Sequence, residues 1–241
     1  MRFSTWFLLA GVPAVLSCSS APWHREHAEP VDAAYLMDIS SGDRDDIAEL
    51  RASEAEMQDQ LAFAERELEG EKADKNVAKQ ELDVAQAEVD EAEARVKAAR
   101  TDAEADSARE RTHDADRHVA WAEAQVGYHG ARIDWAEANV DLAKRRIDLA
   151  TARTERRKAE AVKDIKDGQT PVYNLNTYDE AIVEAELAVH IGEIEADARA
   201  KKAEAYRDAM DKLADGVPED RRGSWRSTLT EPVKELGKDK D

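Results

Sequence analysis

The chain has one cysteine in 241 residues and no excess of basic residues. A single cysteine cannot form an internal disulfide, so stability has to come from packing. The net charge is −19, which would repel nucleic acid and anionic membrane surfaces. We therefore expect no nucleic-acid partner and no membrane affinity of the folded body itself.

Aromatic residues are also scarce, at 5%, whereas 37% of the residues are charged and alanine is abundant. This composition is typical of long helices with narrow apolar stripes. Proline, which breaks helices, is absent between Pro30 and Pro171. Aspartates from Asp43 onward suit a helix start, and basic residues crowd the stretch before Gly168, as at a helix end. We predict an all-α fold with a helical region over residues 43–166, roughly 185 Å long if unbroken.

A heptad of apolar residues runs through the first part of this region. Counted from Ile47, thirteen of sixteen a and d positions are apolar, which predicts a coiled coil. From Ala64 onward most d positions are alanine, which favours close antiparallel packing. Glu71 and Lys75 interrupt the seam at i,i+4 spacing, so we expect them to pair with each other. The a positions are Ile47, Glu54, Leu61, Leu68, Lys75, Leu82, Val89 and Val96; the d positions are Leu50, Met57, Ala64, Glu71, Ala78, Ala85, Ala92 and Ala99.

A second seven-residue repeat covers residues 119–152 and places large apolar side chains on two opposite helix faces. A helix of this kind normally has a partner on each face, so we expect this segment to be sandwiched. One stripe is Val119, Val126, Ile133, Val140 and Ile147; the other is Trp121, Tyr128, Trp135, Leu142 and Leu149.

The two repeats are out of phase across the polar stretch 101–118. This stretch is either a continuous helix with a phase shift or a turn that folds the second segment back on the first. In the second case Thr112 or Asp114 would cap the start of the new helix. We favour the continuous helix, because no proline or glycine marks a turn and alanine keeps helix propensity high.

The clearest break is the loop over residues 167–178, which contains glycine and proline. A capping box, Thr177-x-x-Glu180, predicts a shorter antiparallel helix over residues 179–215. Residues 216–241 form a tail. The tail could form a short docking helix, provided that Pro232 is tolerated. The apolar residues of this helix would be Trp225, Leu229, Val233 and Leu236.

The N-terminal residues have the anatomy of a secretory signal, with Arg2 before a short uncharged segment. Its end, Val15-Leu16-Ser17-Cys18, resembles the lipobox of bacterial lipoproteins. The resemblance implies that residues 1–17 are removed, which leaves a net charge of about −20, and that Cys18 carries three acyl chains. An ordinary signal peptide with an incidental cysteine is the alternative, but the nearby cleavage sites are poor. Residues 18–42 then form a flexible tether.

In the lipoprotein family the residue after the lipidated cysteine affects sorting, and Ser19 implies the outer membrane, with the body facing the periplasm. The overall plan resembles small outer-membrane lipoproteins with coiled-coil bodies. The heptads over residues 43–166 also look like the periplasmic helices of efflux channels and adaptors. Those proteins need barrel strands or β-rich domains, which this sequence does not predict, so we transfer no function from them.

Candidate catalytic or metal-binding residues are few. His24 and His27 are three residues apart, but a zinc site normally needs three or four ligands. His129 falls on the alanine seam, where a satisfied or partly solvated core histidine is the simpler interpretation. The sequence has no glycine-rich phosphate loop and no nucleophile elbow. We therefore expect no enzyme activity, no cofactor and no metal.

The aromatic stripe that contains Trp121, Tyr128 and Trp135 has two interpretations. It could bind a partner helix, since aromatic residues anchor interfaces. It could also pack on the helix 179–215, which we favour because helical stripes usually face a core. For the whole chain we expect a structural or scaffolding role, through self-association or contact with an envelope protein. The alternative is an accessory or chaperone-like subunit of an envelope transport or secretion complex.

Overall fold

In a computed structural model of the chain, the structure describes residues 28–163, 165 and 172–217. A short 3-10 helix, η1 (Ala33–Met37), precedes three long helices: α1 (Ser41–Ala98), α2 (Asp102–Lys163) and α3 (Leu175–Ala214). The described residues contain no strand, which confirms the all-α prediction. The proposed signal, Cys18, the first part of the tether and the tail after Val217 lie outside the described residues.

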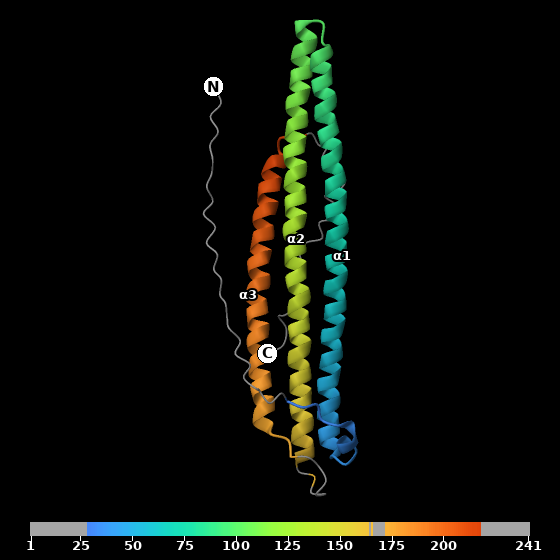
Figure 1. Cartoon of the computed structure of the whole chain (residues 1–241), viewed down its shortest axis with the longest axis vertical. Coiled ribbons are helices and arrows are strands. Elements are labelled where there is room, and N and C mark those ends of the chain that lie inside the picture. Colours follow the sequence, from blue (N-terminus) through green and yellow to red (C-terminus); the bar gives the residue numbers. More distant parts are fainter. Residues whose placement is uncertain (1–27, 164, 166–171, 218–241) are drawn as a thin grey trace.

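The prediction of one continuous helix over residues 43–166 is wrong, because α1 and α2 form an antiparallel hairpin (Figure 1). The chain leaves α1 at Ala99 in an extended conformation, and α2 begins three residues later. The Thr101 hydroxyl accepts from the Glu104 amide (3.2 Å), and the Glu104 carboxylate accepts from the Thr101 amide (3.3 Å). This capping box stabilises the start of α2 without proline or glycine. Thr112, one of the expected caps, lies inside α2 and donates to the Ala108 carbonyl instead.

The heptad in α1 is confirmed. Every a and d position from Ile47 to Ala99 is buried or half-buried, and most other positions along α1 are exposed. The alanines at d that become fully buried are Ala64, Ala78, Ala85 and Ala92. Each buried methyl contributes only about 0.8 kcal/mol, so the stability of this contact is spread along its whole length.

The central helix α2 lies between α1 and α3, as predicted for the sandwiched segment (Figure 1). The 58 residues of α1 make the hairpin about 87 Å long, whereas the 40 residues of α3 extend about 60 Å. The end of α3 reaches the level of Arg117, whose Cδ would lie 3.5 Å from a Cβ added at Gly216. Among the described residues, only α1 and α2 continue beyond that level; we call residues 89–117 the tip.

The opposite end of the bundle, where α1 and α3 begin and α2 ends, is the base. Residues 28–40, which we expected within a flexible tether, are packed there. The Val31 amide donates to Glu155 (2.8 Å), and the Tyr178 hydroxyl donates to the Glu29 carbonyl (2.5 Å). Val31 and Ile39 are buried in one cluster with residues of all three long helices. The described part of the chain begins at Ala28, ten residues after Cys18.

The start of α3 also differs from the prediction. Asn174 is the N-cap, and its side chain accepts from the Asn176 amide (3.2 Å). The capping box predicted at Thr177 is therefore wrong, because Thr177 already lies inside the helix. None of the helices in the described part of the chain is long and apolar enough to cross a membrane.

The hairpin predicts that positions 54 and 151 lie side by side, since the Thr151 hydroxyl donates to Glu54 (3.1 Å). In a continuous helix these residues would be about 145 Å apart. In a Cys18→Ala background, Glu54→Cys with Thr151→Cys should form an intramolecular crosslink with a short bismaleimide, detected as a mobility shift of the monomer on a denaturing gel. Glu54→Cys with Arg109→Cys is the matched control and should not crosslink. A chain that crosslinks only as dimers would contradict the hairpin.

Candidate functional site

The aromatic stripe of α2 packs against α3. Trp121 is 1% exposed and lies with Tyr128 in a cluster formed with Met210, Ala214 and Val217. Further toward the base, the buried side chain of Leu142 packs with Ala138 and with Ala196 of α3. In this structure these side chains form an internal contact, as we favoured; their role in binding a partner stays a prediction.

The remaining two members of the stripe are half-buried. The guanidinium of Arg132 lies 4.9 Å from the centre of the Trp135 ring, a cation–π contact at the edge of the interface. Leu149 is the last member of the stripe, toward the base.

Glycines at the contact between α2 and α3 let the two helices approach closely. A Cβ at Gly127 would lie 3.2 Å from the Tyr206 ring. The corresponding glycine of α3 is Gly192, where a Cβ would lie 3.2 Å from Leu142. At both positions a larger residue would push the helices apart.

On the α1 side of α2, the seam contains an interhelical ion pair. Arg132 Nε donates to Glu71 Oε1 (2.8 Å), and His129 Nδ1 lies 3.5 Å from Glu71 Oε2. Glu71 therefore pairs with Arg132 across the hairpin, and the predicted pairing with Lys75 is wrong. Burial raises the pKa of Glu71, but the hydrogen bonds with His129 and Arg132 outweigh it and leave the pKa below its ordinary value.

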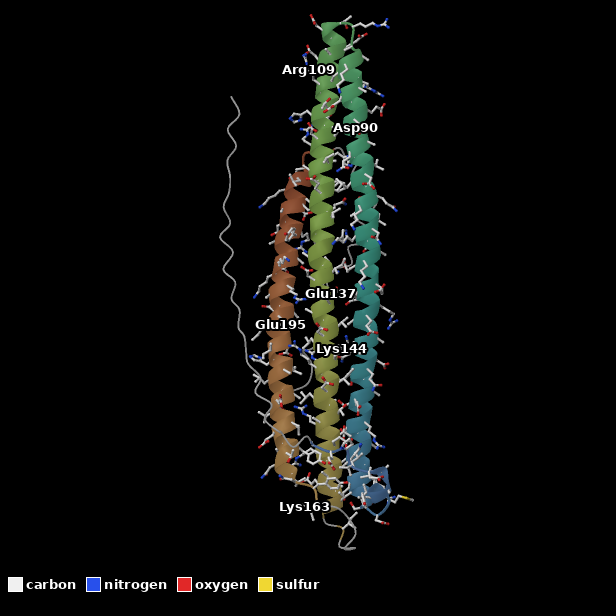
Figure 2. The ribbon with its side chains drawn as sticks, in the orientation of Figure 1. Asp90, Arg109, Glu137, Lys144, Lys163 and Glu195 are labelled. Atoms are coloured by element: carbon white, nitrogen blue, oxygen red, sulfur yellow. The ribbon has the colours of Figure 1, made fainter. Side chains whose placement is uncertain are left out.

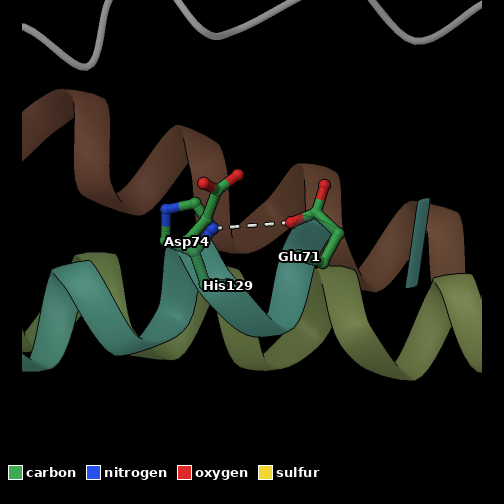
Figure 3. Close-up of side chains that lie close together, drawn as sticks. All are labelled: Glu71, Asp74 and His129. Carbon is green, nitrogen blue, oxygen red and sulfur yellow. Dashed lines mark hydrogen bonds and ion pairs between the residues drawn. The ribbon is translucent and has the colours of Figure 1, made fainter. Parts of the chain in front are cut away.

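The same place holds a group of potential metal ligands, Glu71, Asp74 and His129, whose ligand atoms lie within 4.8 Å of one another (Figure 3). Arg132 already binds one oxygen of Glu71, so a divalent cation here would lie beside a guanidinium. Asp74 is exposed, and exposed carboxylates are common on a charged helix. We therefore assign this cluster to the ion pair that joins α1 and α2.

Basic residues near the end of α2 form ion pairs with both neighbouring helices. From the sequence we expected these residues to mark a helix end. Arg157 pairs with Asp43 and Asp46 of α1. Most of these side chains are substantially exposed, so each pair contributes less than about 1 kcal/mol. Their regular spacing nevertheless fixes the antiparallel register. The pairs with α3 are Arg145–Glu195 (3.2 Å), Arg146–Glu193 (3.1 Å), Arg153–Glu186 (2.9 Å) and Arg156–Asp179 (2.9 Å).

Near the end of α3, His118 is buried and stacks on Trp121, with ring centres 5.9 Å apart. Its Nδ1 lies 3.0 Å from Glu88 of α1. Sequence patterns do not indicate this pair, because Glu88 lies thirty residues before His118 in the chain. The proposed lipidation site, Cys18, and the histidines of the tether, His24 and His27, lie outside the described residues.

Truncation of the aromatic anchor should be costly. We expect Trp121→Ala to lower the free energy of unfolding by about 3–5 kcal/mol, because it leaves a cavity between α2 and α3. Trp135→Ala is the matched control and should cost less, since Trp135 is half-buried. Urea denaturation followed by circular dichroism measures both. Equal losses, or no loss for Trp121→Ala, would contradict an internal role of the stripe.

The Glu71 pair should make stability depend on pH in the acid range. The pKa of Glu71 is lowered in the folded state, so its contribution is complete above the ordinary value of 4.5 and is lost as the pH falls through the lowered value. At pH 7, Glu71→Gln should reduce the free energy of unfolding by about 2 kcal/mol. This difference from wild type should narrow below pH 4.5.

Glu69→Gln provides the control, because Glu69 forms an exposed pair with Lys72 and its loss should have little effect. Urea titrations at several pH values measure the three proteins. A Glu71→Gln deficit that stays constant down to pH 3 would show that its cause is not the carboxylate charge.

Comparison with known proteins assigns no relative to this chain. No protein family, no curated protein and no solved structure matches it. A functional proposal has to rest on the geometry and chemistry of its own residues.

Proposed function

We propose that this chain is a lipid-anchored periplasmic coiled-coil protein with a structural or scaffolding role in the bacterial cell envelope. The observation that carries the proposal is the packing of residues 28–40 at the base. Between Cys18 and Ala28 the chain can span at most about 35 Å. Acyl chains on Cys18 would therefore hold the base close to the outer membrane, and the tip would reach up to about 90 Å farther into the periplasm.

The charge of the body supports an upright rod. The chain carries a net charge of −19, and charged side chains cover the helices from Arg109 near the tip to Lys163 at the base (Figure 2). An acidic surface is repelled by anionic lipid headgroups, so the body has no electrostatic reason to lie along the membrane. Three acyl chains would exceed the two membrane signals that stable anchoring needs.

The alternative role, an accessory subunit of an envelope transport or secretion complex, is favoured by the tip. Among the described residues, the tip has no third helix, and its exposed arginines lie among acidic residues that outnumber them. Arg95, Arg100 and Arg111 line a shallow hollow there, together with alanines of both helices. An acidic segment of an envelope protein would complement this surface.

The anchor is tested by metabolic labelling with a fatty acid analogue and by membrane fractionation. The wild-type chain should incorporate the label and fractionate with the outer membrane, whereas Cys18→Ala should do neither. Ser20→Ala is the matched control and should behave as the wild type. Labelling of Cys18→Ala, or no labelling of the wild type, would contradict lipidation at Cys18.

The two roles are separated by a photo-crosslinking residue placed at the tip, at Arg100, or on the shaft, at Gln58, both exposed. Mass spectrometry then identifies the products formed in cells. An accessory subunit should give one dominant partner from the tip that also co-purifies in stoichiometric amounts. A scaffold should give products from both positions without stoichiometric co-purification. No product from either position would contradict both roles.

A further inference from the structure

The outer side of α1, opposite its contact with α2, carries a second seven-residue repeat. Among the described helices, α2 alone packs along α1, which leaves α1 at one edge of the bundle (Figure 1). Counted from Ile47 as a, the c and f positions point away from the a and d positions that meet α2. Between residues 63 and 87 all of the c and f positions are exposed, and only one is charged. We call these residues the outer seam: Phe63, Arg66, Gly70, Ala73, Val77, Gln80, Val84 and Ala87.

The large apolar residues of the outer seam lie open to solvent in this chain. Phe63 is 41% exposed, Val77 53% and Val84 58%. They lie at c positions, so they follow one another at multiples of seven residues. A helix face that stays in water normally carries charged side chains. A face with almost no charge and a seven-residue repeat is instead typical of a coiled-coil contact.

Gly70 lies between Phe63 and Val77, and packing within the described chain does not require it. Glycine inside a helix is less favourable than alanine, so it needs a compensating contact. At the three glycines inside α2 and α3, a Cβ would lie within 3.3 Å of a neighbouring side chain. A Cβ at Gly70 would meet no described atom within 4 Å. The missing side chain at Gly70 therefore indicates the close approach of a further helix.

The charge beside the outer seam restricts what this helix can be. The flanking b and g positions from 62 to 90 hold seven acidic residues and no lysine or arginine. In a coiled coil the charges at flanking positions select the partner. A second copy of α1 would bring acidic flanks against acidic flanks, whereas a helix with basic flanks is complementary. The acidic flanking residues are Glu67, Glu69, Asp74, Glu81, Asp83, Glu88 and Asp90.

We propose that the outer seam is the docking site for a helix of another protein that carries lysine or arginine on both sides of its apolar residues. The apolar side chains of this helix pack between Phe63, Val77 and Val84, and its backbone comes closest at Gly70. Its cations lie beside exposed carboxylates such as Asp83 and Asp90. This inference does not depend on the lipid anchor or on the proposed function, since the face is part of the folded body.

Two synthetic coiled-coil peptides test the docking site on the full chain. They share one leucine and isoleucine seam and differ only in lysine or glutamate at the flanking positions. In fluorescence anisotropy the lysine peptide should bind roughly tenfold more tightly than the glutamate peptide. Val84→Asp should weaken the lysine peptide roughly tenfold, because it buries a charge in the contact. Leu187→Asp is the matched control, since Leu187 is also 58% exposed but lies on α3.

Binding that is lost in Leu187→Asp and kept in Val84→Asp would assign the peptide to α3 and overturn the proposal. No preference for the lysine peptide would overturn it too.

Reversal of the flanking charges separates a local contact from general attraction to an acidic protein. Asp83→Lys with Asp90→Lys should weaken binding of the lysine peptide roughly tenfold. Glu65→Lys with Glu93→Lys is the matched control, because it changes the net charge equally at exposed e positions, away from the outer seam. Equal weakening by the two pairs would show that only the net charge matters and would contradict the docking site.

The role of Gly70 can be separated from folding. Gly70→Ala should raise the urea midpoint of unfolding, since no described contact requires the glycine. Gly70→Leu should keep the chain folded and weaken the lysine peptide roughly tenfold, because the new side chain occupies the point of closest approach. Ala55→Leu is the control, an exposed position of α1 outside the outer seam. Unchanged binding by Gly70→Leu would contradict the close approach.

In cells, a photo-crosslinking residue at Gln80 identifies the occupant. The crosslinked segment should have lysine or arginine beside apolar residues at helical spacing, and Gly70→Leu should abolish this product. Products formed from Gln58, an exposed glutamine of α1 outside the outer seam, should not change in Gly70→Leu. A product with a second copy, a product with an acidic segment, or no product from Gln80 would overturn the proposal.

Discussion

The whole structure depends on one helix that has to be buried on two sides. α2 has apolar residues on opposite faces, and neither face is stable in water without a partner. The two neighbouring helices cover these faces with different kinds of side chain. On the α1 side, small residues such as Ala78, Ala85 and Ala122 allow close approach, and each contributes little. On the α3 side, large anchors such as Trp121 and Met210 concentrate the burial in a few places.

Charge reinforces this arrangement. The chain is strongly acidic, but the part of α2 near the base presents arginines to both neighbours. α1 and α3 supply the carboxylates. This part of α2 is therefore attracted to both neighbours, although the chain as a whole is acidic. The pairs are mostly exposed and individually weak, and their value lies in register. Any slip of α3 along α2 would break the pairs from Arg145 to Arg156 together.

Much of the fold could be predicted from periodicity, because periodicity reports which positions are buried. The heptad from Ile47 to Ala99 and the two stripes of α2 are local patterns that need no knowledge of the partner. The turn could not be predicted from proline or glycine, since it is made by Thr101 and Glu104, which also occur inside helices. The available signal was the phase difference between the two repeats. This phase difference is equally compatible with a turn and with a continuous helix. Helix propensity favoured the continuous helix, which is wrong.

The candidate site shows the same limit. Trp121 and Tyr128 were found because they repeat every seven residues, and α3 supplies their partners. Glu71 was assigned to Lys75, its neighbour on the same helix, because Arg132 becomes close only once the hairpin forms. Long-range pairs of this kind depend on how the helices are connected and packed. Periodicity within one segment does not report that arrangement.

The distribution of contacts makes the two ends of the molecule physically different. At the base, three helices and residues 28–40 share one cluster, and its residues include Ile47, Val162 and Tyr178. In the tip, α1 and α2 are the only described helices that meet, and they do so through small side chains such as Ala92 and Ala108. Local opening costs least where few apolar contacts are lost, so the tip should open well before the base. A rod built in this way is held together most firmly at the base, and its tip is the part that can most easily change shape.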